Sequence, residues 1–587
     1  MSKIKKRIIF LVPMHISWDN FSLPGYVDSA IKTKDGKFIN PPRTDLPLGP
    51  LSISSYLKKY IEIDVKLIDF NAEVNALEKM PFNSFFEICN HYLEKNRNYK
   101  PYIVGVSSLF SPSFENFMDC GKLARIIWPN AVIVGGGHIP SNSYKYIYDN
   151  LDCVDYDALC FGEGEKPMLG LLNAENPYEY IENNPAWITR SKVKNKKDFL
   201  PQHDFITDLD EIPFYDYDLC DLNKHDCNIL ASTYSSEKKR GFHVMTSRGC
   251  PFHCTFCASH RIHGRSMRYH SLNRIENDFA RLVSNYDADT IIFQDDHLMA
   301  SKDRVYKILE IVKKYGLESI YQNGLTLYSL DRPMLEAFRS VGVRHLVLPV
   351  ESGSERVLRE CMKKPLKMEI SERVARDCRD LGIYTNTNIL LGMPGETILD
   401  LEVGRQNLKR IQTNWFNIVS ASPLVGSEMH EISVRKGYIA ENQFGSDYKY
   451  SVLSTEEFNA EFLQEYKYFL NLDLNFANNT DMRLKEYELA KRGFLNVLSI
   501  REDHAFAHYA LACCYEKTND FTLSKKHYVQ YLKNIREDFW NRWAWVFGLK
   551  DVDAGNWSID DFENLECIFK SGKIRSEAFF GHGLDFA

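Results

Sequence analysis

The sequence has no apolar run near the roughly 18 consecutive residues that a helix needs to cross a bilayer. Its start, MSKIKKRIIFLVP, holds only a short apolar stretch, too short for the apolar region of a secretory signal peptide. Excess positive charge is also missing, because 72 Lys and Arg stand against 79 Asp and Glu. We therefore expect no membrane span, no nucleic-acid partner and a location in the cytoplasm.

A disulfide framework is not indicated either. The 14 cysteines are scattered over 587 residues with no export signal, and thiols in the cytosol stay reduced. Apolar residues make up 44% and charged residues 26%, which is close to the average of globular proteins. The length predicts three or four domains, of which we expect three. Most cysteines are expected in cores, but Cys250, Cys254 and Cys257 fall within one short segment.

The first part of the chain alternates short apolar runs with helix-length stretches. The runs are 8–13, 65–70, 103–108, 132–137 and 157–165. This alternation predicts a parallel, doubly wound α/β sheet of the Rossmann-like (flavodoxin-like) kind. Ligands of such sheets bind outside the carboxyl ends of the strands, where Ser107, Ser108 and the glycines 135–137 fall.

A second set of strands and helices follows a connector of mixed charge. Its apolar runs are 242–250, 289–298, 319–327, 345–353, 386–396 and 416–426. Six strands with intervening helices predict a partial (β/α)6 barrel, whose chemistry would sit at the carboxyl ends of its strands. The predicted domains are 1–185 (α/β), 186–240 (connector), 241–440 (barrel) and 441–587 (α-helical).

Helices dominate after about residue 440. Ala490 and Phe494 recur as Ser524 and Tyr528, and AHYALACCYEKTNDF (507–521) has the pattern of a tetratricopeptide unit. A pair of amphipathic helices that cap the barrel would give a similar pattern, so both interpretations stay open. A tetratricopeptide-like domain would offer a surface for a protein partner.

The three clustered cysteines lie in SRGCPFHCTFCASH, residues 247–260. Three thiolates leave one iron of a [4Fe-4S] cluster without a protein ligand, and an open metal position can chelate a small molecule. A structural zinc site is the alternative, and it would need a fourth ligand such as His253 or His260. The surrounding barrel pattern favours the cluster.

This spacing after the first barrel strand resembles the signature of radical S-adenosylmethionine enzymes. The resemblance implies a [4Fe-4S] cluster on Cys250, Cys254 and Cys257, S-adenosylmethionine, and an external one-electron reductant of the flavodoxin or ferredoxin type. In the family an aromatic residue before the third cysteine lies against the adenine, and segments like ESGSERVL (351–358) and GMPGET (392–397) hold the rest of the molecule. The implied contacts are Phe256, Asp295, Glu351, Ser352 and Gly392.

One of these contacts departs from the pattern of the family. The family often has Gly-Gly-Glu at the end of the second strand, whereas this chain has FQDDHL, with Asp295 and Asp296. Members with an additional amino-terminal domain commonly show an acidic pair here, and Asp295 is the expected contact. The alternative is that Asp295 only complements a helix dipole.

The amino-terminal segment resembles the cobalamin-binding domain of one large subfamily. The matching segments are PLGPLSISSYL (47–57), GVSSL (105–109), GGGHIPS (135–141) and FGEGE (161–165). The implied cobalamin contacts are Leu48, Gly49, Ser107, Ser108, Gly135, Gly136, Gly137, His138, Gly162 and Glu163. A flavodoxin-like domain without a ligand is the alternative. The Asp-x-His-x-x-Gly motif of other cobalamin proteins is absent, and His15 is expected to be a turn or surface residue.

The resemblance implies that the chain is an enzyme. The commonest reaction of the subfamily is methylation of an unactivated carbon, in which the 5′-deoxyadenosyl radical removes a hydrogen atom and methylcobalamin supplies the methyl group. Two alternatives stay open. The first is a cobalamin-dependent cyclisation or rearrangement without methyl transfer. The second is a cobalamin-independent radical enzyme, or a peptide-binding module with a vestigial amino-terminal domain. The substrate, a small molecule or a peptide, is not readable from the residues.

Overall fold

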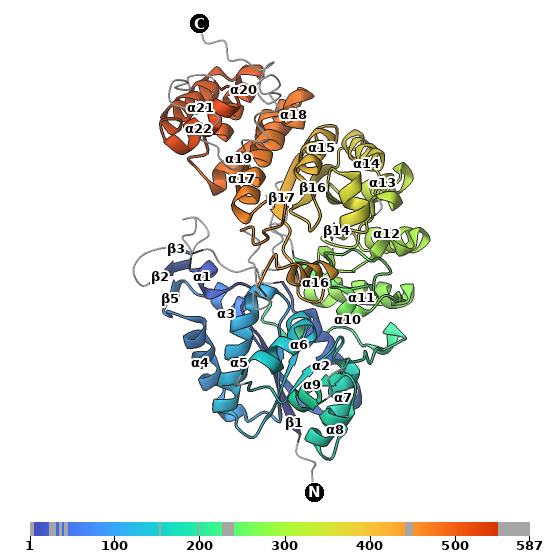
Figure 1. The fold of residues 1–587 in the computed structure, drawn as a ribbon. Helices are drawn as coiled ribbons and strands as arrows, with labels where there is room; N and C mark the ends of the chain where they lie inside the picture. Colours follow the sequence, from blue (N-terminus) through green and yellow to red (C-terminus); the bar gives the residue numbers. More distant parts are fainter. Residues whose placement is uncertain are drawn as a thin grey trace. The chain divides into compact units, whose positions relative to one another are not determined.

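The computed structural model describes residues 5–22, 31–33, 38–39, 45–151, 154–195, 199–225, 240–364, 366–440 and 450–549 (Figure 1). The chain forms two compact units. The first comprises Met1–Ile229, Lys238–Gly324 and Pro423–Asp447, and the second comprises Leu230–Glu237, Leu325–Ser422 and Tyr448–Ala587. In the described part of the chain no helix has both the length and the apolar character to span a membrane.

The first unit begins with a six-stranded sheet of order β4-β1-β6-β7-β8-β9. Its strands are β1 (Lys6–Val12), β4 (Ile63–Asp69), β6 (Ile103–Ser107), β7 (Val132–Gly136), β8 (Ala158–Cys160) and β9 (Trp187–Ile188). All neighbours pair in parallel except β9, which runs antiparallel to β8. The five strands predicted from the apolar runs are confirmed.

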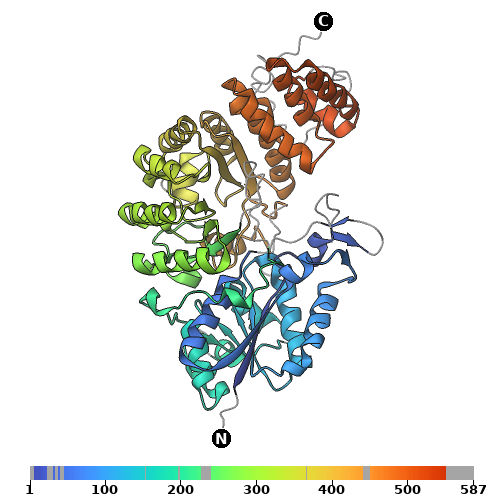
Figure 2. The same cartoon turned by 180° about the vertical axis from the view of Figure 1, so that it is seen from behind.

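Helices cover both faces of this sheet (Figure 2). One face packs against α4 (Phe85–Lys95), α5 (Phe114–Ile127) and α6 (His138–Asn150), and the other packs against α2 (Leu48–Tyr60) and α7 (Glu165–Asn173). The shorter helices are α1 (Trp18–Phe21), α3 (Phe70–Asn75), α8 (Pro177–Asn183) and α9 (Arg190–Asn195), and β2 (Ile31–Thr33), β3 (Phe38–Ile39) and β5 (Lys79–Met80) form a small separate sheet. Because both faces are covered, the strands read as continuous apolar runs.

The six predicted barrel strands form two parallel three-stranded sheets. The first unit contains β10 (Gly241–Val244), β13 (Thr290–Phe293) and β14 (Glu318–Tyr321), and the second unit contains β15 (His345–Glu351), β16 (Tyr384–Leu391) and β17 (Trp415–Ser420). Their helices are α11 (Leu272–Tyr286), α12 (Lys302–Lys314), α13 (Arg332–Ser340), α14 (Met368–Asp380) and α15 (Ile398–Leu408). The strand and helix alternation is the one that the sequence predicts.

The described residues of the carboxyl-terminal region form helices and the loops that connect them, with no strand among them. Its elements are α17 (Ala460–Leu472), a π-helical turn (Asp473–Ala477), α18 (Thr480–Arg483), α19 (Tyr487–Ile500), α20 (Ala505–Lys517), α21 (Phe521–Asn534) and α22 (Asp538–Val546). A short turn at Asn519, with a positive φ of 62°, joins α20 to α21, which pack against each other. Whether this hairpin works as a tetratricopeptide unit stays a prediction.

The helical region is built onto β17. Asn475 is fully buried, and its side chain accepts a hydrogen bond from the Phe416 amide and donates one to the Phe416 carbonyl, both at 2.8 Å. An amide side chain thus pairs with a strand that lies at the edge of its sheet, as a further strand would. A second connection is the buried ion pair between Arg405 and Asp473, at 2.7 Å.

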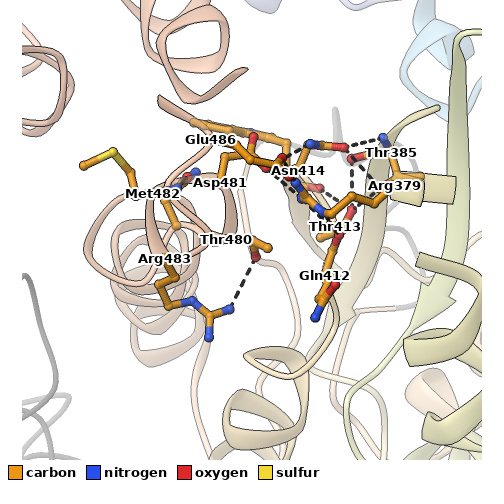
Figure 3. Close-up of polar contacts among 12 residues, drawn as sticks. Arg379, Thr385, Gln412, Thr413, Asn414, Thr480, Asp481, Met482, Arg483 and Glu486 are labelled. Carbon is orange, nitrogen blue, oxygen red and sulfur yellow. Dashed lines mark hydrogen bonds and ion pairs between the residues drawn. The ribbon is translucent and has the colours of Figure 1, made fainter. Parts of the chain in front are cut away.

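A cluster of polar side chains extends this attachment (Figure 3). Arg379 at the end of α14 forms a 2.7 Å ion pair with Asp481 of α18 and also pairs with Glu486. Asn414 donates to Asp481 at 2.9 Å and accepts from the Thr385 amide at 2.8 Å. Burial raises the pKa of Asp481 to about 6 despite the neighbouring guanidinium. These contacts join the barrel strands of the second unit to the helices that follow them.

We expect Asn475→Ala to lower the stability of the second unit by about 2–4 kcal/mol, because both buried backbone groups of Phe416 lose their partner. Asn471→Ala is the matched control, since the Asn471 side chain accepts a hydrogen bond from Asn475, whereas the side chain that bonds to the Phe416 backbone is that of Asn475. Thermal melting and limited proteolysis between the barrel strands and α17 measure the difference. Equal behaviour of the two variants would contradict a structural role for Asn475.

Candidate functional site

The three cysteines lie on one closed loop, residues 249–267, which we call the cysteine loop. A two-residue antiparallel pair, β11 (Ser247–Arg248) with β12 (Arg268–Tyr269), forms its base. Gly249 has φ +96°, and a Cβ there would lie 2.4 Å from the Ser266 carbonyl oxygen, so only glycine fits. The Cys250 amide donates to the Gly264 carbonyl at 3.3 Å, which holds the first cysteine against the returning chain.

The thiols of Cys250, Cys254 and Cys257 are half-buried and form no disulfide. Burial raises the pKa of Cys250 to about 11, and the nearby Cys257, Asp296 and Cys254 add to the rise. In the part of the chain that the structure describes, no three His, Cys, Asp or Glu side chains converge closely enough to hold a metal ion. The fit of a [4Fe-4S] cluster rests on three neighbouring cysteine thiols that form no disulfide, the donor set that such a cluster takes.

Both ends of the cysteine loop are tied to one carboxylate, Glu163 of the FGEGE segment. Its side chain is 3% exposed and contacts Arg248 at 3.1 Å, Arg268 at 2.5 Å and His263 at 2.8 Å. Burial alone would raise the pKa of Glu163, but the Arg248 charge and the hydrogen bonds from Arg268 and His263 outweigh it and hold the pKa well below its usual range. We call this group of side chains, together with Glu165, the carboxylate clamp.

Glu165 completes the carboxylate clamp. It accepts from Arg248 at 2.8 Å and from the Ser52 hydroxyl of α2 at 2.5 Å. The two arginines face each other across the β11–β12 pair, so the base of the cysteine loop is fixed to the α/β domain at two carboxylates. The predicted role of Glu163 as a cobalamin contact stays a prediction, while the described ion pairs of its side chain join it to His263 of the cysteine loop and to the two arginines at the base of the loop.

The carboxyl edge of the six-stranded sheet offers open space at some of the predicted positions. A Cβ added at Gly136 would meet nothing within 4 Å, and one at Gly49 would meet only the Ser107 hydroxyl at 3.9 Å. His138 begins α6 beside them, and burial lowers its pKa to about 4, with His263 adding to the fall. A ledge of glycines and small side chains fits a broad flat ligand such as cobalamin, because the backbone can approach it closely.

Other predicted cobalamin positions are engaged inside the domain. Gly135 packs on Phe117 and Leu159 and leaves no room for a Cβ. The Ser108 hydroxyl bonds to Ser113 at 2.6 Å, and Gly137 and Gly162 adopt positive φ in tight turns. Leu48 begins α2. The structure thus leaves an open ledge at Gly49, Ser107 and Gly136, next to the start of α6 at His138, whereas Gly135 is closely packed and Gly137 and Gly162 lie in turns.

His15 lies in the loop after β1. Its ring meets Phe110 edge-on at 4.9 Å, and burial lowers its pKa against the opposing effect of Asp69 and Asp45. Its backbone amide donates to Asn71 at 2.9 Å. These contacts fit the expected role of a turn residue.

The acidic pair at the end of β13 divides into two roles. Asp295 is fully buried, and its carboxylate accepts from the Thr246 amide and hydroxyl and from the Ser247 hydroxyl, at 3.1, 2.7 and 2.6 Å. Asp296 has a buried carboxylate oxygen without any hydrogen-bond partner. Its charge acts on both Cys250 and His138, so it lies near them. Sequence reasoning named the pair but selected Asp295, whereas the free oxygen belongs to Asp296.

The second unit holds the predicted contacts that follow β15. Glu351 has φ +74°, a strained conformation for a residue other than glycine, of the kind that clusters at functional sites. Lys364 donates to the Glu351 carboxylate at 3.3 Å and to the Pro349 carbonyl at 2.6 Å. The Ser352 hydroxyl accepts from the Ser354 amide at 3.1 Å. Lys364 was not predicted, because no short motif marks it.

The GMPGET segment follows β16 in the same unit. Gly392 has φ +90°, and the buried Glu396 carboxyl accepts from the amides of Gly392 and Met393 at 2.7 and 3.0 Å. Burial raises the pKa of Glu396 to about 7 against these hydrogen bonds. A Cβ at Gly392 would lie 2.6 Å from Leu463 of α17. Glu396 therefore shapes the turn in which Gly392 is the predicted contact, and sequence reasoning missed it.

We expect Glu163→Gln to reduce iron retention by the cysteine loop after reconstitution and a chelator challenge. Loss of the charge leaves two buried guanidinium groups undercompensated, at a cost on the order of 3 kcal/mol. Because the folded pKa is lowered, the wild-type advantage should persist above the ordinary value of 4.5 and fade as the pH drops below it.

Glu73→Gln is the control for this variant, since Glu73 pairs with Lys224 at 2.9 Å in a partly exposed position of the same unit. Iron content per chain and the melting temperature measure both variants. Full iron retention by Glu163→Gln would show that the clamp does not support the loop.

Two family models match the chain. The Radical SAM superfamily matches residues 244–403, which contain the cysteine loop, and the B12 binding domain matches residues 45–172, which contain the open ledge. The first match implies a [4Fe-4S] cluster, S-adenosylmethionine and an external reductant, and the second implies cobalamin.

Known proteins align with half or more of the chain. The cytidylyl-2-hydroxyethylphosphonate methyltransferase of Streptomyces wedmorensis is 27% identical over 450 residues, which cover 70% of this chain and 83% of that protein. The anaerobic magnesium-protoporphyrin IX monomethyl ester cyclase of Rubrivivax gelatinosus is 25% identical over 313 residues, covering 53% and 54%.

Among solved structures, the cobalamin-dependent S-adenosylmethionine radical enzyme OxsB, with aqua-cobalamin and S-adenosylmethionine bound, shares the fold. It superposes with a TM-score of 0.58 at 16% identity and covers 98% of this chain and 84% of that one. The predicted fold class, a B12-binding α/β domain, a radical SAM domain and a helical carboxyl-terminal region, is confirmed. The chain therefore combines an amino-terminal B12-binding domain with a radical SAM domain, and it is homologous to cobalamin-dependent radical S-adenosylmethionine methyltransferases.

Proposed function

We propose that this enzyme methylates an unactivated carbon of a small-molecule or peptide substrate, with cobalamin as the methyl carrier. The observation that carries the proposal is the similarity to the phosphonate methyltransferase over 70% of this chain, together with the matches to a B12 binding domain and to the Radical SAM superfamily. The reaction would take place in a reducing compartment such as the cytoplasm, where the three thiols of the cysteine loop stay available for iron.

When bound, the cluster and S-adenosylmethionine supply a 5′-deoxyadenosyl radical, and methylcobalamin supplies the methyl group. In the proposal, Cys250, Cys254 and Cys257 hold the iron. The residues proposed for S-adenosylmethionine are Phe256, Asp296, Glu351, Ser352 and Gly392, and those proposed for cobalamin are Leu48, Gly49, Ser107, Gly136 and His138. The convergence of the two sets stays part of the proposal, as do the domain bounds 1–185, 186–240, 241–440 and 441–587.

The carboxylate clamp is the part of the chain that we propose positions the two cofactor regions relative to each other. It fixes the base of the cysteine loop to the FGEGE segment, and this segment follows β8 of the sheet that carries the open ledge. Radical chemistry requires its reacting groups to be held in a defined geometry, because a misplaced radical reacts elsewhere. A rigid connection between the two cofactor regions supports a reaction that uses both.

A cyclisation without methyl transfer is the second candidate. It is favoured by the similarity to the magnesium-protoporphyrin monomethyl ester cyclase, which extends over about half of each chain. Both reactions would use the same cofactors, so only the product distinguishes them.

The decisive experiment follows the methyl group. The anaerobically reconstituted enzyme with cobalamin is expected to form labelled methylcobalamin from S-adenosylmethionine labelled at its methyl carbon, and to release 5′-deoxyadenosine with a one-electron reductant. Cys250→Ala should abolish the release of 5′-deoxyadenosine, whereas Cys361→Ala, which changes another half-buried cysteine, should retain it. An enzyme that binds iron but no cobalt would contradict the methyl-transfer proposal.

The acidic pair gives a separate prediction. Asp296→Asn should weaken the binding of S-adenosylmethionine about tenfold, because charge-assisted hydrogen bonds to a ligand amine contribute roughly 1.5–3 kcal/mol. Asp295→Asn should instead lower the melting temperature, since Asp295 bonds only within the protein in its described contacts. Equilibrium dialysis measures the affinity, and thermal melting measures the stability. Weaker binding in Asp295→Asn with unchanged binding in Asp296→Asn would identify Asp295 as the ligand contact.

A further inference from the structure

A pocket of about 340 Å³ opens beside the cysteine loop, within the first unit. Its walls are the cysteine loop with α10 (His260–His263) on one side and the segment around α16 (Glu428–Arg435) on the other. Its lining residues are His253, Cys254, His260, Arg261, Arg265, Gly426, Glu428, Glu431, Ile432 and Arg435. Cys254 is the one cluster cysteine among them, and none of the residues proposed for S-adenosylmethionine or cobalamin is included.

The walls of this pocket are held in place by direct contacts. The Met429 amide at the start of α16 donates to the Thr255 carbonyl of the cysteine loop at 2.8 Å. Arg261 donates to Asn142 of α6 at 3.3 Å, and Arg265 donates to the Phe252 carbonyl. The pocket is therefore a formed feature that gives access to one side of the cysteine loop.

The charge of the pocket differs in sign from that of the chain. The chain carries a net charge of −7, whereas the pocket brings the guanidinium groups of Arg261, Arg265 and Arg435 against only two carboxylates. His260 adds no charge near neutral pH, because burial and then the neighbouring Arg265 and Arg261 lower its pKa to about 4. Phe252, on the same loop, exposes 38% of its surface. A locally basic surface with an exposed aromatic ring is complementary to an acidic protein partner.

We propose that this pocket is the docking site of the external one-electron reductant, an acidic protein of the flavodoxin class, and that the electron enters at the Cys254 side of the cluster. In this step the flavin hydroquinone of the donor loses one electron and becomes the semiquinone, and the cluster gains that electron. Entry from this side leaves the open iron free for S-adenosylmethionine. The inference rests on the cluster at the cysteine loop but not on methyl transfer.

Two charge reversals on α16 test the proposal in opposite directions. Arg435 and Glu431 are both exposed and lie four residues apart on the same short helix. Arg435→Glu should lower kcat/KM for flavodoxin-driven release of 5′-deoxyadenosine about tenfold at low salt, and Glu431→Lys should raise it, because steering depends on charge. Both differences should disappear near 0.5 M salt, where the screening length is only about 4–5 Å.

Two controls separate docking from damage to the enzyme. With dithionite as the reductant, both variants should match the wild-type rate within about twofold, since a small chemical donor needs no docking surface. Lys307→Glu, an equivalent charge change at an exposed position of α12, should leave the flavodoxin-driven rate unchanged. Calorimetric titration of the reconstituted enzyme with flavodoxin should show the same order of affinities as kcat/KM.

Three results would overturn the docking site. The first is an equal loss of 5′-deoxyadenosine release with dithionite and with flavodoxin. The second is a flavodoxin-driven rate that does not change in either α16 variant. The third is an effect of Lys307→Glu on that rate as large as the effect of Arg435→Glu. The proposed methylation would survive each of them, because the experiment measures cleavage of S-adenosylmethionine alone.

Discussion

The buried carboxylate of Glu163 is the interaction on which the arrangement of the first unit depends. Two guanidinium groups and an imidazole surround it at 2.5–3.1 Å, with almost no access to water. Buried charges are tolerated only when each is paired with an opposite charge. Removal of the Glu163 carboxylate would therefore leave buried guanidinium groups with an uncompensated desolvation cost. That requirement specifies a single position for the cysteine loop against the B12-binding domain.

In the second unit the important feature is the edge strand β17, which within the described residues has a strand neighbour on one side only. A sheet that does not close leaves unpaired backbone groups on its last strand, which invites pairing with other chains. Here Asn475 pairs with the backbone of Phe416, and the ion pairs of Arg405 and Arg379 bury the adjoining helices against the barrel half. The start of the helical region therefore packs against the three-stranded sheet of the second unit, and α20 and α22 pack in turn on the π-helical turn and on α17.

Much of this architecture could be predicted from the sequence, because its signals are local. Apolar runs of strand length gave the six barrel strands, and the spacing of Cys250, Cys254 and Cys257 gave the cluster loop. What could not be predicted depends on contacts between distant segments. Glu163 and Arg268 are far apart in the chain, so the FGEGE motif could not reveal the carboxylate clamp, and the cobalamin contact that the motif implies stays a prediction. The hydrogen bonds that fill the Asp295 carboxylate come from Thr246 and Ser247, about fifty residues away in the chain, so sequence alone could not decide between Asp295 and Asp296.

Electron paramagnetic resonance of the enzyme with both a reduced cluster and cob(II)alamin bound would show whether the carboxylate clamp holds the cysteine loop and the open ledge in one rigid unit. We expect spin–spin coupling between the two centres in the wild type and weaker coupling in Glu163→Gln. Two independent signals in the wild type, with no coupling, would show that the two centres are not held close together.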